Sequence, residues 1–201
     1  MIKYLALITI SLLFLQNIKG QEEESSFDEV ISFHPFHLVN NGIRIDYDRK
    51  IAKNHWIQIG PQFYAAEKNE DNDGREYNEL MGVGFSVYHR IYLGSKAPSL
   101  GTYFSYGATF SHFNLKYEEP TSSRTGVTSE TSINKFGGDI VIGYQTQAFE
   151  RLIIDVFAGL GGRYADRDFT GLTHKKFNKF IYDYGYTGNV ILGGIRIGFS
   201  F

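Results

Sequence analysis

The sequence contains no cysteine and only four prolines among its 201 residues. Without cysteine the chain has no disulfide, no thiolate nucleophile and no cysteine for lipid attachment. Scarce proline leaves long stretches free to form strands, because proline is confined to strand ends, edges and bulges. After residue 20 the sequence lacks the run of about 20 apolar residues that a membrane-spanning helix needs. These absences disfavour both a disulfide-stapled secreted domain and a helical membrane protein.

Residues 1–20 have the pattern of a secretory signal peptide. Lys3 gives a positive start, residues 4–15 form an apolar core, and Gly20 is a small residue at the expected cleavage point. Removing this segment, with Lys3 and Lys19, leaves 18 basic and 22 acidic side chains and a formal charge of −4. A mildly acidic exported chain is not expected to bind nucleic acid.

Apolar and polar residues alternate along most of the mature sequence, and alternation predicts strands with one apolar and one polar face. The last segment is the clearest case, because one face carries Ile195, Ile197, Phe199 and Phe201. Eight strands are expected, at about 30–39, 43–51, 55–66, 77–93, 101–117, 132–146, 152–166 and 185–201. Glycine and aromatic residues are abundant, which is typical of transmembrane barrels.

The connections between these strands differ in length in a regular way. The long polar stretches at 67–76, 118–130 and 170–183 alternate with short turns at 52–54, 94–100 and 147–151. Bacterial barrels have an even strand number, short periplasmic turns and longer external loops. The sequence therefore predicts an eight-stranded, antiparallel, up-and-down transmembrane β-barrel over residues 30–201, preceded by an acidic periplasmic tail at 21–29.

The first strand is the least secure of the eight. Pro35 lies inside it, although proline is unusual in a paired strand. Asn41-Gly42 follows and predicts a tight hairpin turn. If this strand were wrong, we expect a different pairing at the N-terminus and the same fold class.

Nine charged residues fall on the face opposite the aliphatic side chains. They are Arg44, Asp46, Asp48, Arg90, Lys135, Asp139, Asp155, Arg163 and Arg196. Side chains fill the interior of an eight-stranded barrel, and buried charges there must be paired. These residues are predicted to form an internal charge network that plugs the lumen. A narrow ion path is the alternative.

Aromatic residues lie near both ends of the predicted strands. Those toward one end are Tyr92, Tyr103, Phe149, Phe199 and Phe201, and those toward the other are Phe113, Tyr117, Phe136, Tyr164, Phe169, Tyr184 and Tyr186. Aromatic girdles at the two membrane interfaces are the simplest interpretation.

In these features the chain resembles the small outer-membrane β-barrel proteins of Gram-negative bacteria, the OmpA/OmpX-like group in the broad sense. The resemblance implies residence in the outer membrane with both termini periplasmic, in contact with outer-membrane lipid and lipopolysaccharide. It also implies that the terminal run Ile195, Ile197, Phe199 and Phe201 is the signal read by the barrel-assembly machinery. A structural or surface-interaction role is expected, with an unknown external ligand.

The sequence gives little support for an enzyme, and no cofactor is expected. The His112-Phe113-Asn114 segment is similar to the His-x-Ser-Asn pattern of the lipid A deacylase family, but phenylalanine occupies the serine position. Ser111 and His112 are neighbours and should point to opposite faces. The six histidines are scattered, so no metal site is predicted. A lipid-modifying enzyme and a small pore remain alternatives, and a periplasmic lipid-binding barrel would need an apolar lumen.

Overall fold

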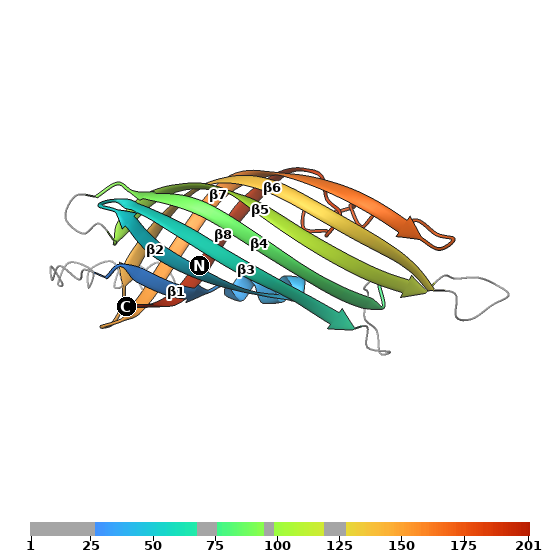
Figure 1. Ribbon diagram of the computed structural model, residues 1–201, viewed down its shortest axis with the longest axis horizontal. Helices are drawn as coiled ribbons and strands as arrows, with labels where there is room; N and C mark the ends of the chain where they lie inside the picture. Colours follow the sequence, from blue (N-terminus) through green and yellow to red (C-terminus); the bar gives the residue numbers. More distant parts are fainter. Residues whose placement is uncertain (1–26, 68–75, 95–98, 119–127) are drawn as a thin grey trace, which may run out of the picture.

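A computed structural model describes residues 27–67, 76–94, 99–118 and 128–201. Antiparallel strands follow one another in sequence order and close into a single ring of eight, which confirms the predicted all-β, up-and-down architecture (Figure 1). They are β1 (Glu29–Phe33), β2 (Gly42–Ala52), β3 (His55–Glu67), β4 (Glu79–Tyr92), β5 (Gly101–Glu118), β6 (Thr128–Gln147), β7 (Leu152–Thr170) and β8 (Gly188–Ser200). Among the described residues, no helix is both long and apolar enough to cross a membrane.

The predicted signal peptide lies outside the described residues, as do most of the acidic tail and large parts of the predicted loops at 67–76 and 118–130. The strands β2 to β8 fall close to their expected positions. The main difference is length, because β6 begins at Thr128 and β7 continues to Thr170. Alternation fades toward these ends, where both faces carry polar residues.

The predicted strand at 30–39 is wrong in its second half. The strand β1 ends at Phe33, and a 3₁₀ helix, η2 (Pro35–Asn40), takes the place of residues 35–39. Proline cannot donate to a sheet ladder, and its fixed φ suits the first turn of a helix. The expected hairpin turn is also absent. Asn41 instead ends η2 in the left-handed region at φ 54°, with its N–H directed to carbonyl groups of the helix.

The barrel has two ends, which we call basal and distal. The basal end is where β1 begins and β8 ends, and there the Phe201 N–H donates to the Glu29 carbonyl oxygen at 3.0 Å. The distal end is the opposite one, where β5, β6 and β7 extend furthest (Figure 1).

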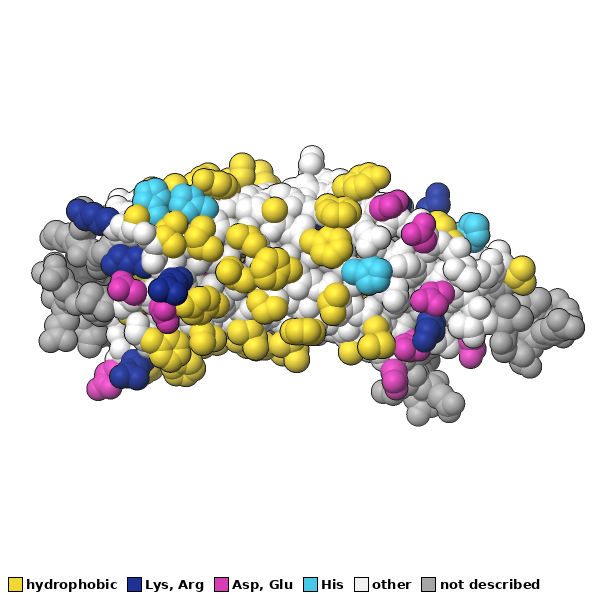
Figure 2. Space-filling model, viewed as in Figure 1, with side chains coloured by type: hydrophobic (Ala, Val, Ile, Leu, Met, Phe, Trp, Pro, Cys, Tyr) yellow, Lys and Arg dark blue, Asp and Glu magenta, His cyan; other side chains and the backbone are white. Residues whose placement is uncertain are grey.

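The outer surface carries an apolar belt of exposed side chains on every long strand. Figure 2 shows these side chains across the middle of the barrel, with charged residues gathered toward both ends. Along β7, the belt runs from Ile154 to Tyr164, and polar Asp166 and Asp168 follow distally. The same change from apolar to polar occurs along β5 after Phe110.

The lumen is filled in three layers. The basal aromatic cluster closes one end and consists of Phe27, Val30, Trp56, Tyr92, Tyr103, Val141 and Ile153. The distal aromatic cluster closes the other and consists of Tyr64, Tyr77, Leu80, Phe113, Leu115, Tyr117, Ile133, Ala165 and Phe177. Charged residues occupy the layer between them.

This layering corrects the prediction of aromatic girdles at four positions. Tyr92, Tyr103, Phe113 and Tyr117 are at most 3% exposed and point into the lumen. They alternate with outward residues in the same strands, so strand parity and not residue type decides their side. Phe136 and Tyr164 do face outward, as expected for girdle residues.

The segment between β7 and β8 covers the distal end, although its composition predicts a polar loop. Phe177 adopts a positive φ of 46° and enters the distal aromatic cluster. The hydroxyl of Tyr184 donates to the Asn40 carbonyl at 3.0 Å, which ties this segment to η2. The side chain of Lys179 bonds to Glu76, and this hydrogen bond raises the pKa of Lys179.

Candidate functional site

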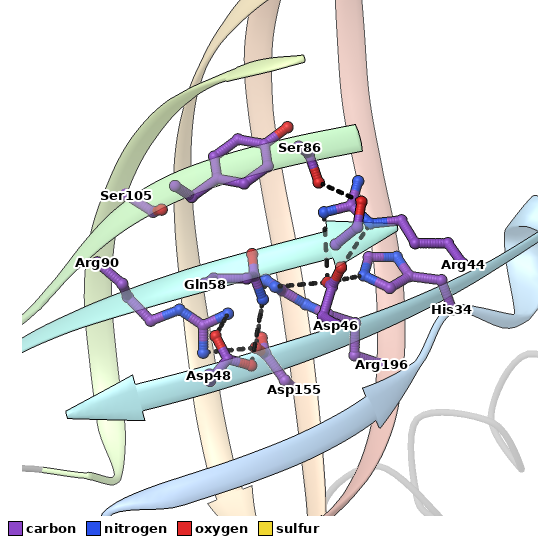
Figure 3. Close-up of polar contacts among 12 residues, drawn as sticks. His34, Arg44, Asp46, Asp48, Gln58, Ser86, Arg90, Ser105, Asp155 and Arg196 are labelled. Atoms are coloured by element: carbon purple, nitrogen blue, oxygen red, sulfur yellow. Dashed lines mark hydrogen bonds and ion pairs between the residues drawn. The ribbon is translucent and has the colours of Figure 1, made fainter. Parts of the chain in front are cut away.

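The charged layer of the lumen is the candidate site, and Figure 3 shows the part of it around Asp46, Asp48 and Asp155. The carboxylate of Asp46 is fully buried, and the side chains of three residues contact it. Arg44 Nε donates to Asp46 Oδ1 at 2.7 Å, and His34 Nε2 lies 2.5 Å from Oδ2. Arg196 Nη1 approaches the same oxygen at 3.6 Å. Asp46 therefore joins β2, β8 and the start of η2.

A second centre forms around Asp155 on β7. Its carboxylate lies 3.3 Å from Arg90 and 3.2 Å from Arg196, and it accepts a hydrogen bond of 2.8 Å from the Tyr103 hydroxyl. The guanidinium of Arg90 sits 4.3 Å from the centroid of the Tyr103 ring, a cation–π arrangement. Asp48 lies on the other side of Arg90, at 3.4 Å. These contacts link β2, β4, β5, β7 and β8 across the lumen.

A third centre lies closer to the distal end. Arg163 makes two hydrogen bonds to Asp139, at 2.5 and 3.1 Å, and the Tyr88 hydroxyl donates to the same carboxylate at 2.5 Å. Lys135 also points inward, but its ammonium donates to the backbone oxygen of Asp183 at 2.8 Å. Lys135 thus belongs to the contacts that hold the distal segment and not to a carboxylate pair.

The structure therefore places all nine sequence-predicted residues in the lumen and brings eight of them into ion pairs. Each of the four carboxylates meets at least one guanidinium. Breaking a buried pair leaves an uncompensated charge and is strongly destabilising, by about 3–5 kcal/mol. A network of this kind fixes the strands relative to one another.

Sequence reasoning missed the neutral members of the network. His34, Tyr88, Tyr103 and Gln145 all bond to its charged groups. The signal for three of them was present in strand parity. Tyr88 shares the parity of Arg90 on β4, Gln145 that of Asp139 on β6, and Tyr103 that of polar Ser105 on β5. The fourth, His34, could not be placed because the strand containing it was predicted to continue.

Between the charged layer and the distal segment lies a cavity of about 530 Å³. Its inner lining includes Gln62 of β3, Ser111 of β5 and Asp139 of β6. This volume lies within the range of about 300–1,000 Å³ that is typical of ligand sites.

Ser111 and His112 lie on opposite faces of the wall, as strand alternation predicts. Ser111 points into the lumen, whereas His112 lies on the outer face and its Nδ1 is 2.8 Å from Asn134 Oδ1. A nucleophile and its base must lie within hydrogen-bond reach, and these two side chains lie on opposite faces of the wall. In the part of the chain that the structure describes, no group of three or more His, Asp or Glu could hold a metal ion.

Two further histidines pair on the outer face near the basal end. The rings of His55 and His89 stack with their centroids 5.1 Å apart, and Nδ1 of His89 lies 2.9 Å from the Tyr106 hydroxyl.

Comparison with known protein-family models finds no match to this chain, and comparison with curated proteins finds none either. The function must therefore be inferred from the geometry alone.

Proposed function

We propose that this chain is an outer-membrane β-barrel protein with a closed lumen and a structural or surface-interaction role. The observation that carries the proposal is the apolar belt. Ile43, Phe63, Val83, Ile140, Leu160 and Ile191 are each at least 49% exposed, and they come from six different strands. An exposed apolar surface that encircles a protein far exceeds the few hundred Å² usual for a soluble monomer.

The height of the belt fits a bilayer. On β7 it runs over ten residue steps, from Ile154 to Tyr164. At about 3.3 Å per residue and a strand tilt of about 40°, this corresponds to roughly 25 Å along the barrel axis. That is the height of the lipid-facing band in outer-membrane barrels. Hydrocarbon would remove the belt from water without any change in the fold.

The filled lumen supports a closed barrel over the alternative of a pore. Trp56 and Tyr103 are completely buried in the basal cluster, and Leu115 and Ile133 are completely buried in the distal cluster. A water-filled path would have to cross both clusters and the charged layer between them. We expect no stable single-channel conductance from the purified protein in planar bilayers.

The distal end supports a role at a surface. The strands β5, β6 and β7 extend beyond the belt, and there their outward residues become polar or charged, as at Lys116, Glu130 and Asp168. The segment between β7 and β8 adds exposed Leu172, Phe180 and Tyr182 to this end. Exposed aromatic residues among charges are typical of surfaces that contact other molecules.

Cell fractionation combined with gel mobility tests the membrane proposal. The expressed chain should sediment with outer membranes and resist extraction by high salt. Without boiling it should migrate differently from the boiled sample, because a folded barrel binds less detergent than an unfolded chain. Recovery in the soluble periplasmic fraction would contradict the proposal.

A further inference from the structure

The wall of the barrel is incomplete between β8 and β2 in its distal half. The strand β1 pairs with β8 only from Val30 opposite Ser200 to Phe33 opposite Ile197. The other edge of β8 remains paired with β7 as far as Gly188. Among the described residues, 188–196 of β8 therefore have a strand neighbour on one side only.

The helix η2 lies beside this unpaired edge and covers it incompletely. The Phe36 ring approaches β8 at Gly194, where a Cβ added to the glycine would lie 3.5 Å from the ring atom Cδ2. A 3₁₀ helix cannot supply the ladder of hydrogen bonds that a strand would. Free backbone groups are costly in hydrocarbon, so such an edge must face protein or a hydrated, polar space.

The 530 Å³ cavity runs along this edge, since residues 190–194 and Arg196 line it, and it passes through the wall. Its lining includes two exposed apolar residues, Val39 of η2 and Ile191 of the belt on β8, which are 79% and 71% exposed. It also includes Arg44 and Asp139, which are 7% and 4% exposed and lie deep in the lumen. We call the passage between η2 and residues 191–194 of β8 the side opening.

The two ends of this cavity differ in chemistry. At the side opening the lining is apolar, with Phe36, Val39 and Ile191. Inside, the lining carries four cationic side chains, namely Arg44, Lys135, Arg163 and Arg196, but Asp139 is the one carboxylate among the described lining residues. Lys135 is bonded to a carbonyl oxygen and not to a carboxylate, so its charge stays available to a ligand.

We propose that the cavity binds an amphiphile with one hydrophobic chain and an anionic head group. The head group lies inside, where the ammonium of Lys135, the guanidinium of Arg163 and the free edge of β8 supply donors. The chain leaves through the side opening between Phe36 and Ile191 and lies along the belt. This inference rests on the proposed membrane location, because the belt must meet lipid for the chain to leave there.

Either a phosphate or a carboxylate head would satisfy these donors, since both are anionic oxygen acceptors. Native mass spectrometry of the full mature chain, released from a neutral detergent, can distinguish them. Three probes are offered separately: lysophosphatidylglycerol for the phosphate, palmitate for the carboxylate, and lysophosphatidylcholine as a zwitterionic control. We expect one or both anionic probes to bind at least about tenfold more tightly than the control, as one charge-assisted hydrogen bond suffices for that ratio.

Two pairs of variants locate the site. Lys135→Gln should weaken anionic binding about tenfold, whereas Lys116→Gln, on the outer face of β5, should leave it unchanged. Gly193→Leu adds a bulky side chain on the outer face beside Ile191, at the mouth of the side opening, where an added Cβ meets only a backbone oxygen at 3.7 Å. Its control is Gly162→Leu on β7, where an added Cβ meets nothing within 4 Å. Gly193→Leu should weaken binding several-fold and the control should not.

Heat-dependent gel mobility of every variant shows that the barrel is folded, so loss of binding is not confused with loss of the fold or of membrane insertion. Equal binding of lysophosphatidylcholine, or no effect of either test variant, would overturn the proposal. A loss with Gly193→Leu alone would overturn the placement of the head group at Lys135. A loss with Lys135→Gln alone would overturn the exit of the chain through the side opening.

Discussion

The wall formed by β5, β6 and β7 and the seam between β8 and β1 are built from the same kind of alternating sequence, yet they differ in completeness. In the wall, 18 of the 20 residues of β6 pair with β5, and 18 pair with β7. At the seam, β1 contributes only 5 residues, and a 3₁₀ helix follows. The cavity is lined by residues of the complete wall, such as Ser111 and Asp139, but its outward lining residues Val39 and Ile191 lie at the short seam. The length over which β1 pairs with β8 thus sets where the cavity can open to the outer surface.

The largest effect is expected from Asp46→Ala, because this carboxylate joins the seam to the rest of the lumen. The substitution leaves Arg44 and Arg196 with less compensation in a buried site. We expect a loss of about 3–5 kcal/mol in the free energy of unfolding. Urea titration in detergent micelles can measure it through the fluorescence of Trp56, the one tryptophan in the chain.

The matched control is Asp168→Ala, since Asp168 is exposed on the distal extension of the wall. It should change the unfolding free energy by less than about 0.5 kcal/mol. Similar values for the two variants would show that the charges at the seam do not hold the barrel together.

A smaller effect is expected from Tyr103→Phe. The hydroxyl donates to Asp155 at 2.8 Å and accepts from Arg196 at 2.6 Å, so its removal leaves two charged groups short of a partner. We expect a loss of about 1–3 kcal/mol in the free energy of unfolding. Tyr106→Phe is the control, because that hydroxyl is on the outer face and bonds to His89. A greater loss in the outer-face variant would show that the Tyr103 hydroxyl is not needed by the buried charges.

The next effect is expected at the seam itself, from Pro35→Ala. Proline fits the first turn of η2, so its removal should destabilise the fold by about 0.4–1 kcal/mol through the unfolded chain. It should not lengthen β1, since Asn41 and the bond from Tyr184 to Asn40 still hold η2 in place. Hydrogen exchange of β8 amides can test this, and new protection at residues 190–194 would show that proline alone keeps the seam open.

The smallest effect is expected from Lys179→Gln in the distal segment. Lys179 pairs with Glu76 in full contact with solvent, where screening reduces the value of an ion pair. The midpoint of urea unfolding should not move measurably. A clear shift would show that the distal segment contributes to stability through charge and not through Phe177 and Tyr184.

The sequence is sufficient to predict most of the fold, because alternation is a local signal. The positions of β2 to β8, and the inward set that includes Arg90 and Asp155, follow from strand parity alone. Prediction fails where a local signal has two meanings. Pro35 lies within an alternating run but begins a helix. Tyr92 is a residue type expected in a membrane girdle, but it shares the strand parity of Arg90 and therefore points into the lumen.

The cavity and the side opening could not be predicted in the same way. They depend on how far β1 pairs with β8, two segments at opposite ends of the sequence. They also depend on Phe177 and Tyr184, whose polar neighbours conceal their role in covering the lumen. Such features arise from the closed ring and not from any single stretch of residues.

The most direct test of the central claim, that the belt faces lipid, uses the absence of cysteine. Single cysteines can be placed along β7 at Val156, Leu160 and Asp168, and the folded variants reconstituted in lipid vesicles. Their reaction with a water-soluble maleimide is then compared before and after detergent is added. We expect positions 156 and 160 to be protected in vesicles and position 168 to react in both conditions. Equal reaction at all three positions in intact vesicles would contradict the claim.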